Sequence, residues 1–133
     1  MRGRVIAESL RIGAMVELAG VALSSVSRYD VSAGTRPDGA VRSEDGAVAG
    51  QPSVWTFIDF GGHDDLADAV AEELAGALLG EGGWYADIDV ADDKIVVFAN
   101  RVFRYQRGDR AGRDAAAEHG RSVGVPEHQL DWE

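Results

Sequence analysis

A chain of 133 residues with a net charge of −10 and no cysteine fits a single domain and excludes several classes of function. The acidic balance argues against nucleic-acid binding and against docking on an anionic membrane, because both need a basic surface. The absence of cysteine excludes disulfides, thiol nucleophiles and thiolate metal sites.

The N-terminal residues 1–20 follow neither the helical nor the strand period, and glycines interrupt them at positions 13 and 20. We interpret this stretch as a short strand or an irregular segment that covers the sheet. The apolar residues after Met1 are broken by Glu8 and Arg11, so neither a signal peptide nor a membrane helix is predicted. We therefore expect a cytoplasmic protein, and the excess of Arg over Lys is typical of a GC-rich bacterial genome.

Two strands and a long loop are predicted next. Residues 21–31 and 53–60 alternate in polarity or carry β-branched residues at every second position, which is typical of strands. In the second strand, Trp55 and Phe57 lie on the face opposite the other apolar residues. The stretch at about 33–52 is rich in Gly, Ala, Asp and Ser and has no period, so it predicts a mobile loop.

The second half of the chain predicts a helix, two or three strands and a second helix. Asp64 is a good N-cap, and leucine or valine then recurs every four residues as far as Leu78. Strands are predicted over 84–90, 94–99 and 102–106, with a turn at Asn100 and Arg101. A last helix is predicted from Asp109 to Val123, ended by Gly124 and Pro126.

This order predicts an α+β fold. Two strands, a helix, two or three strands and a helix give a ββαββα order, which is a circular permutation of the ferredoxin-like arrangement. Short connections favour antiparallel neighbours. We expect an antiparallel sheet of four to five strands with both helices on one face, in one domain over residues 1–133.

The C-terminal stretch GVPEHQLDW, residues 124–132, resembles a group of small, mostly actinobacterial proteins that share a G-V-P-x-x-Q-L-D-W-like motif. The strands predicted at 96–98 and 102–105 belong to the same resemblance, which covers roughly the last 80 residues. The resemblance implies no activity.

Charge is segregated along the chain. Eleven acidic residues and no Lys or Arg lie between Asp59 and Asp93, whereas six basic residues and one acid lie between Lys94 and Arg113. Three arginines, Arg110, Arg113 and Arg121, fall at helical spacing in the last helix, and three more come just before them, at positions 101, 104 and 107. They form either a patch for an acidic partner or internal pairs with the acidic first helix, through Asp65, Asp68 and Glu72, and we favour internal pairing.

The polar residues predict no metal site and no catalytic centre. Asp87, Asp89, Asp92 and Asp93 have part of the spacing of a calcium loop, but the glycine and the closing glutamate are missing. His63, His119 and His128 share no metal-ligand spacing, and no serine near His63 in the sequence can act as a nucleophile. We predict no cofactor.

The strands at 53–60 and 94–99 are apolar on both faces, and two helices on one side would leave the other side open. We expect a homodimer to cover that face through Trp55 and Phe57, with residues 1–20 or a ligand as the alternatives. The favoured function is a non-catalytic, self-associating interaction protein, immunity- or antitoxin-like, that has a possible protein partner. The alternative is a small-molecule binder or small enzyme whose pocket on the sheet is lined by residues that include Trp55, Phe57, Tyr85, Phe98 and Arg104.

Overall fold

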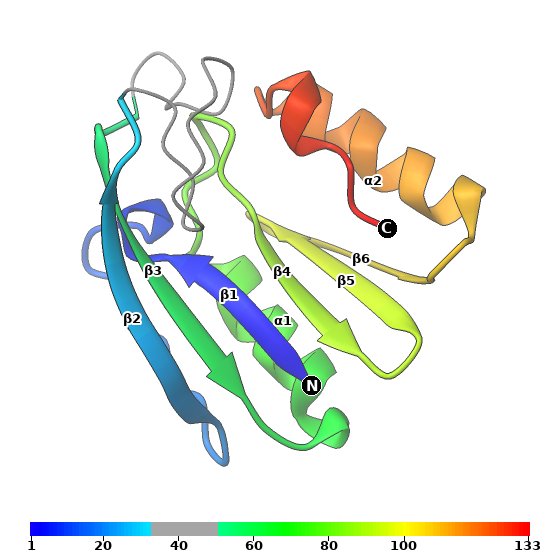
Figure 1. The fold of residues 1–133 in the computed structure, drawn as a ribbon, viewed down its shortest axis with the longest axis horizontal. Helices are drawn as coiled ribbons and strands as arrows, with labels where there is room; N and C mark the ends of the chain where they lie inside the picture. The colour runs from blue at the N-terminus through cyan, green and yellow to red at the C-terminus, as the bar shows by residue number, and fades with distance from the viewer. Residues whose placement is uncertain (33–50) are drawn as a thin grey trace.

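A computed structural model describes residues 1–32 and 51–133. The described residues form one six-stranded antiparallel sheet with two α-helices (Figure 1). The α+β class predicted from the sequence is confirmed. The loop predicted at about 33–52 lies, except for its last two residues, outside the described residues. No helix in the described part of the chain is both long and apolar enough to cross a membrane.

The elements in chain order are β1 (Arg2–Ile6), β2 (Ala22–Asp30), β3 (Val54–Gly61), α1 (Ala67–Ala77), β4 (Ala86–Val90), β5 (Asp93–Phe98), β6 (Arg101–Gln106) and α2 (Arg110–Ser122). Single 3₁₀ turns occupy Ala7–Ser9, Asp64–Leu66 and Glu127–Gln129. In space the strands run β2-β3-β1-β4-β5-β6. The sheet therefore has six strands instead of the four to five expected, and the order is βββαβββα instead of ββαββα.

The additional strand is β1, which occupies the middle of the sheet. Arg2 pairs with Gly61 of β3 on one side and with Asp89 of β4 on the other. Gly3 follows, and a Cβ there would lie 2.4 Å from the Phe60 ring, so a larger residue at this position would force that ring to shift. The glycine and the two arginines hide the strand period in the sequence.

The two helices lie on opposite faces of the sheet, and the expectation that both cover one face is wrong. Strand β5 shows this directly, because its alternate residues enter different cores. Ile95 and Val97 pack in the core beneath α1, whereas Val96 and Phe98 pack in the core beneath α2. In Figure 1, α1 lies behind the sheet. The strand is apolar on both faces because each face has its own helix.

Residues 7–21 lie beside α1 and share its core. Leu10, Val16, Leu18 and Val21 pack against this core. The amide of Arg11 donates a hydrogen bond to the carbonyl of Ala77 at 2.8 Å, which holds the segment to the end of α1. Residues 1–20 thus supply both a strand and an irregular cover, the two forms considered from the sequence.

Both predicted ends of α2 are confirmed. The carboxylate of Asp109 accepts a hydrogen bond from the amide of Ala111 at 3.1 Å, as an N-cap does. At the other end the amide of Val125 donates to the carbonyl of Gly120 at 2.9 Å, and Gly124 has φ +94°, a conformation that favours glycine. The C-terminal segment then turns back, and Leu130 and Trp132 pack on the core beneath α2.

Candidate functional site

A row of oppositely charged side chains crosses the face of the sheet that α2 covers only in part. We call it the charge row: Asp59 of β3, Arg4 of β1, Asp87 and Asp89 of β4, and Lys94 of β5. Arg4 contacts Asp59 through two hydrogen bonds, of 2.6 and 3.0 Å. Lys94 donates to Asp87 at 2.5 Å and to Asp89 at 3.2 Å. Each charge has a partner of opposite sign within the row.

The pairing shifts the pKa values of these groups. The hydrogen bonds from Arg4 lower the pKa of Asp59, and the same contact raises the pKa of Arg4. Burial by itself would lower the pKa of Lys94, but the two carboxylates raise it. Burial would likewise raise the pKa of Asp89, but Lys94 and Arg107 lower it. Every shift favours the charged form, so the row is an ion-pair network at neutral pH.

Three carboxylates of the acidic cluster around β4 and β5 contact basic partners. Asp87 and Asp89 contact Lys94, and Asp89 also accepts a hydrogen bond from Arg107 at 2.6 Å. Asp93 accepts one from Arg104 at 2.8 Å. Within the described residues no group of three or more His and carboxylate side chains is placed to hold a metal ion.

A shallow depression lies over the charge row, and the side chains that line it include Arg2, Ser25 and most members of the row. Ser25 donates to Asp59 at 2.7 Å, so its hydroxyl is also engaged. Because Arg4 and the three carboxylates of this depression are already engaged in ion pairs, it offers little free charge to a ligand.

The aromatic candidates fall into two separate packed clusters. Trp55 and Phe57 are each only 7 % exposed and pack with Trp84 and Val31. Tyr85 and Phe98 contact Trp132 in the core beneath α2, with ring centroids 5.0 and 5.9 Å from it. Trp55 and Phe57 lie on the face opposite Ile58 and Phe60, as their alternation predicted, but that face is opposite α1 alone and not opposite both helices. Their burial within the chain removes the reason to expect a second copy over them.

The three candidate arginines of α2 do not reach α1. Arg121 makes hydrogen bonds to Glu127, at distances from 2.6 to 3.1 Å. Arg113 lies 3.6 Å from Asp114 and 3.7 Å from Glu133. The predicted pairing of these arginines with Asp65, Asp68 and Glu72 is wrong, because the two helices cover opposite faces of the sheet.

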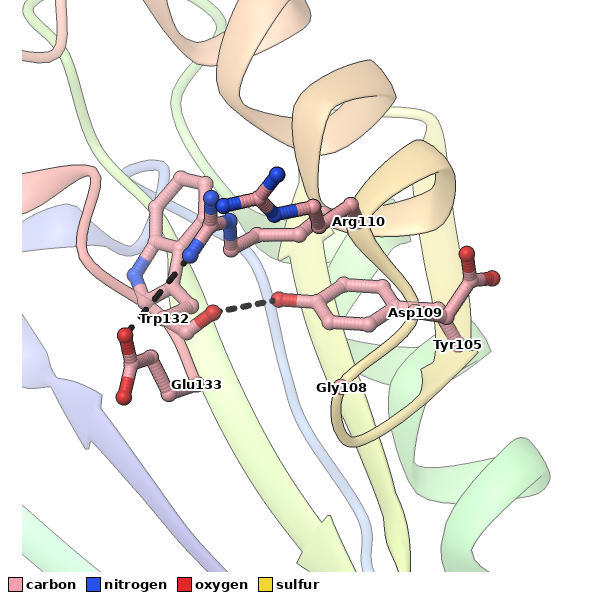
Figure 2. Close-up of a pocket in the computed structure, with 7 residues that line it drawn as sticks. Tyr105, Gly108, Asp109, Arg110, Trp132 and Glu133 are labelled. Carbon is pink, nitrogen blue, oxygen red and sulfur yellow. Dashed lines mark hydrogen bonds and ion pairs between the residues drawn. The ribbon is translucent and has the colours of Figure 1, made fainter.

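Arg110 and Arg113 line a small depression between β6, the start of α2 and the C-terminal segment (Figure 2). Its other walls include Tyr105, whose hydroxyl donates to the backbone carbonyl of Trp132 at 3.2 Å. Asp109 and Glu133 also line it, so two carboxylates balance the two arginines. The balance of charge gives this depression no preference for an anion.

Arg104 is the basic residue that does reach α1. Its guanidinium donates to Asp68 at 2.9 Å and to Asp93 at 2.8 Å, which joins β6 to the first helix. The opposite charges raise the pKa of Arg104. Arg104 was both a ligand candidate and one of the arginines expected to pair with the acidic first helix, and for this residue the contact with Asp68 confirms the pairing. Its place on the α1 face depends on the register of β6.

The three histidines lie in three different elements of the fold. His63 is exposed just before Asp64, and His128 is exposed in the 3₁₀ turn after α2. His119 packs against Phe98 and Phe103, with ring centroids 4.8 and 5.5 Å away. Burial and the nearby Arg101 lower the pKa of His119. These contacts give His119 a packing role.

The most distinctive exposed surface lies on the outer side of α1. We call it the acidic face: Asp65, Asp68, Glu72 and Glu73 together with Ile12 and Met15 of the adjacent segment. Glu72 and Glu73 line one depression with Met15 and Arg11. Ile12 is fully exposed and Met15 is 76 % exposed. Among the described residues, no ion pair engages Asp65, Glu72 or Glu73.

Comparison with known proteins gives no match: no family model, no curated protein and no solved structure matches the chain.

Proposed function

We propose that this chain is a non-catalytic interaction protein whose acidic face binds a basic partner protein, as an immunity or antitoxin protein binds its target. We also propose that it self-associates, through a different surface that is argued below. The observation that carries the main proposal is the set of exposed carboxylates on α1 beside two large exposed apolar side chains, Ile12 and Met15.

This combination has the composition of a protein interface. Typical interfaces have an apolar centre and a polar or charged rim. Ile12 and Met15 would supply the centre, and Glu72 and Glu73 line the adjacent depression. A surface of one sign attracts a partner of opposite sign and raises its association rate. The net charge of −10 favours a basic partner for the whole chain as well.

The small-molecule alternative has less support. Its expected walls, Trp55, Phe57 and Phe98, are buried against other side chains. Fold alone does not separate the two functions, because similar α+β sheets serve many roles. The exposed surface of α1 therefore carries the proposal, and the aromatic side chains do not.

The test begins with cross-linking in an extract of the native host. A carbodiimide joins carboxylates to lysines, so it reports contacts made by the acidic face. We expect cross-linked peptides that contain Glu72 or Glu73, joined to a basic protein. The purified pair is then measured by titration calorimetry at two salt concentrations, and we expect weaker binding at high salt.

Two charge-reversed variants make the test specific. Glu72→Lys with Glu73→Lys should weaken binding by about 10-fold to 100-fold, because like charges then oppose each other. Asp114→Lys with Glu118→Lys is the matched control, since both residues are exposed on α2 and the change in charge is the same. Equal losses for the two variants, or an acidic partner, would contradict the proposal.

A further inference from the structure

The two edges of the sheet differ in their protection against another strand. An edge strand exposes unpaired backbone N–H and C=O groups, and proteins protect such edges with charged residues or short strands. β6, at one edge, has six residues with Arg101 and Arg104 among them. β2, at the other edge, has nine residues and no charge from Ala22 to Ser27. A bulge between Leu23 and Ser25 is the protective feature visible on β2.

β2 also exposes apolar side chains. Val26 is 54 % exposed and Leu23 is 65 % exposed, although both lie opposite core strand β3, at Ile58 and Phe60. Both side chains lie on the α1 face of the sheet. The helix itself covers this face farther along the sheet, at β4 and β5. A long, exposed and weakly charged edge of this kind is a template for strand pairing.

Charge identifies the occupant of this edge. Two copies of a chain with a net charge of −10 repel each other over most of their surface. β2 is an exception, because it carries one arginine, Arg28, and one aspartate, Asp30. Its net charge is zero, so a second copy can approach β2 without local repulsion.

We propose that the chain forms a homodimer in which β2 of one copy pairs antiparallel with β2 of the other, centred on Val26. This inference goes beyond the proposed partner binding and does not depend on it. When the pair is centred on Val26, all nine residues of the strand are paired. Arg28 of one copy then lies opposite Ser24 of the other, so no like charges meet. The two six-stranded sheets then join into one continuous sheet.

The geometry closes the assembly at two copies. An antiparallel pair of identical edges has two-fold symmetry, so each copy uses the same surface and no β2 edge is left free. The arginine-bearing edge of β6 disfavours further growth. A strand pair buries less area than the roughly 1,200 Å² of a stable standard interface, so we expect dissociation in the micromolar range.

Sedimentation equilibrium of the purified chain, from about 1 to about 500 μM, tests the proposal over the range expected for such small interfaces. We expect a monomer–dimer equilibrium for the wild type and a monomer for Val26→Lys. Because Val26 is half exposed, Val26→Lys should keep its circular dichroism spectrum and melting temperature. Ala115→Lys is the matched control: it makes the same change in charge at an exposed apolar residue of α2, and it should still dimerise.

A second measurement uses the absence of native cysteine. Single cysteines at Ser25, Val26 and Ser27, with Gln106→Cys of β6 as control, are oxidised at a concentration where the dimer forms. We expect a disulfide-linked dimer to form most readily at Val26→Cys and not at Gln106→Cys, because directly opposed residues of an antiparallel pair lie close enough to be bridged.

Several outcomes overturn the proposal: a monomer at every concentration, a dimer that survives Val26→Lys, open-ended polymers, or preferential cross-linking at β6. None of these outcomes tests the binding of the basic partner. That binding is tested by Glu72→Lys with Glu73→Lys, which alters a different surface. If β2 instead pairs with a strand of another protein, the chain alone would be a monomer, and that result also overturns the homodimer.

Discussion

The two faces of the sheet are stabilised in different ways. On the α1 face, aliphatic side chains such as Leu74, Ile88 and Val97 form a continuous apolar core. On the other face, two aromatic clusters flank the charge row. The comparison shows how a sheet with an incomplete helical cover remains stable: where no helix lies over the strands, charges of opposite sign are paired with one another.

The largest effect that tests this comparison is expected at Leu74, which is buried in the core between α1 and the sheet. Leu74→Ala removes apolar contacts and leaves a cavity, so it should lower the free energy of unfolding by about 2–5 kcal/mol. Urea denaturation monitored by circular dichroism measures this loss. A loss below that of the charge-row variants would mean that the α1 face is not the main source of stability.

Gly3 tests how closely β1 approaches the same core. Gly3→Ala brings a methyl group against the ring of Phe60 and should cost about 1–3 kcal/mol, as overpacking does. Combining it with Phe60→Leu should recover part of this loss, since the smaller side chain leaves room. A double-mutant cycle of urea denaturation measures the coupling between the two positions, and strict additivity would contradict the predicted clash.

Lys94 tests the opposite face. The residue is 8 % exposed, and Lys94→Met keeps its apolar stem but leaves Asp87 and Asp89 without their shared cation. We expect a loss of about 1–2 kcal/mol at pH 7, because a partly buried carboxylate that has lost its partner is costly. Arg107→Met is the control and should cost less, since Arg107 is more exposed. Equal stability of Lys94→Met and wild type would show that the charge row is dispensable.

The pH dependence should give the smallest effect. The pKa values of Asp59 and Asp89 are lower in the folded chain than the ordinary 3.8, so their stabilising effect is present above that pH. It is lost as the pH falls through their lower, folded-state values. For Lys94, whose pKa is raised above 10.5, the loss comes as the pH rises past that value. Melting temperatures of wild type and Lys94→Met should therefore converge only as the pH falls below 3.8 and through the lowered pKa of Asp89.

Local signals in the sequence predicted most elements of the fold. Asp109 and Gly124 predicted the ends of α2, and Asn100 adopts the predicted positive φ, at 57°. The hairpin turn lies one residue earlier than expected, at Ala99 and Asn100, because Phe98 pairs with Arg101. Such errors of one residue arise because a turn residue fixes its own conformation but not the register of the strands beside it.

The long-range features could not be predicted in the same way. β1 has two arginines and a glycine among its five residues, so its strand character depends on partners far along the chain. The placement of the helices on opposite faces had one visible signal, the apolar character of both sides of β5. Asp87 and Asp89 lie on the face opposite the α1 core, where Lys94 contacts both of them. Their partner Lys94 was not predicted, because that contact depends on the pairing of β4 with β5.

The central position of β1 has a consequence for folding. β2 and β3 form one antiparallel pair, β4 to β6 form another group, and β1 alone joins them. Either group can form from neighbouring parts of the chain. The complete sheet forms only when both groups are present, because β1 pairs with a strand of each. Contacts between distant residues slow folding, because the chain loses entropy before the contacts form. We therefore expect the pairing of this five-residue strand to complete the sheet late in folding.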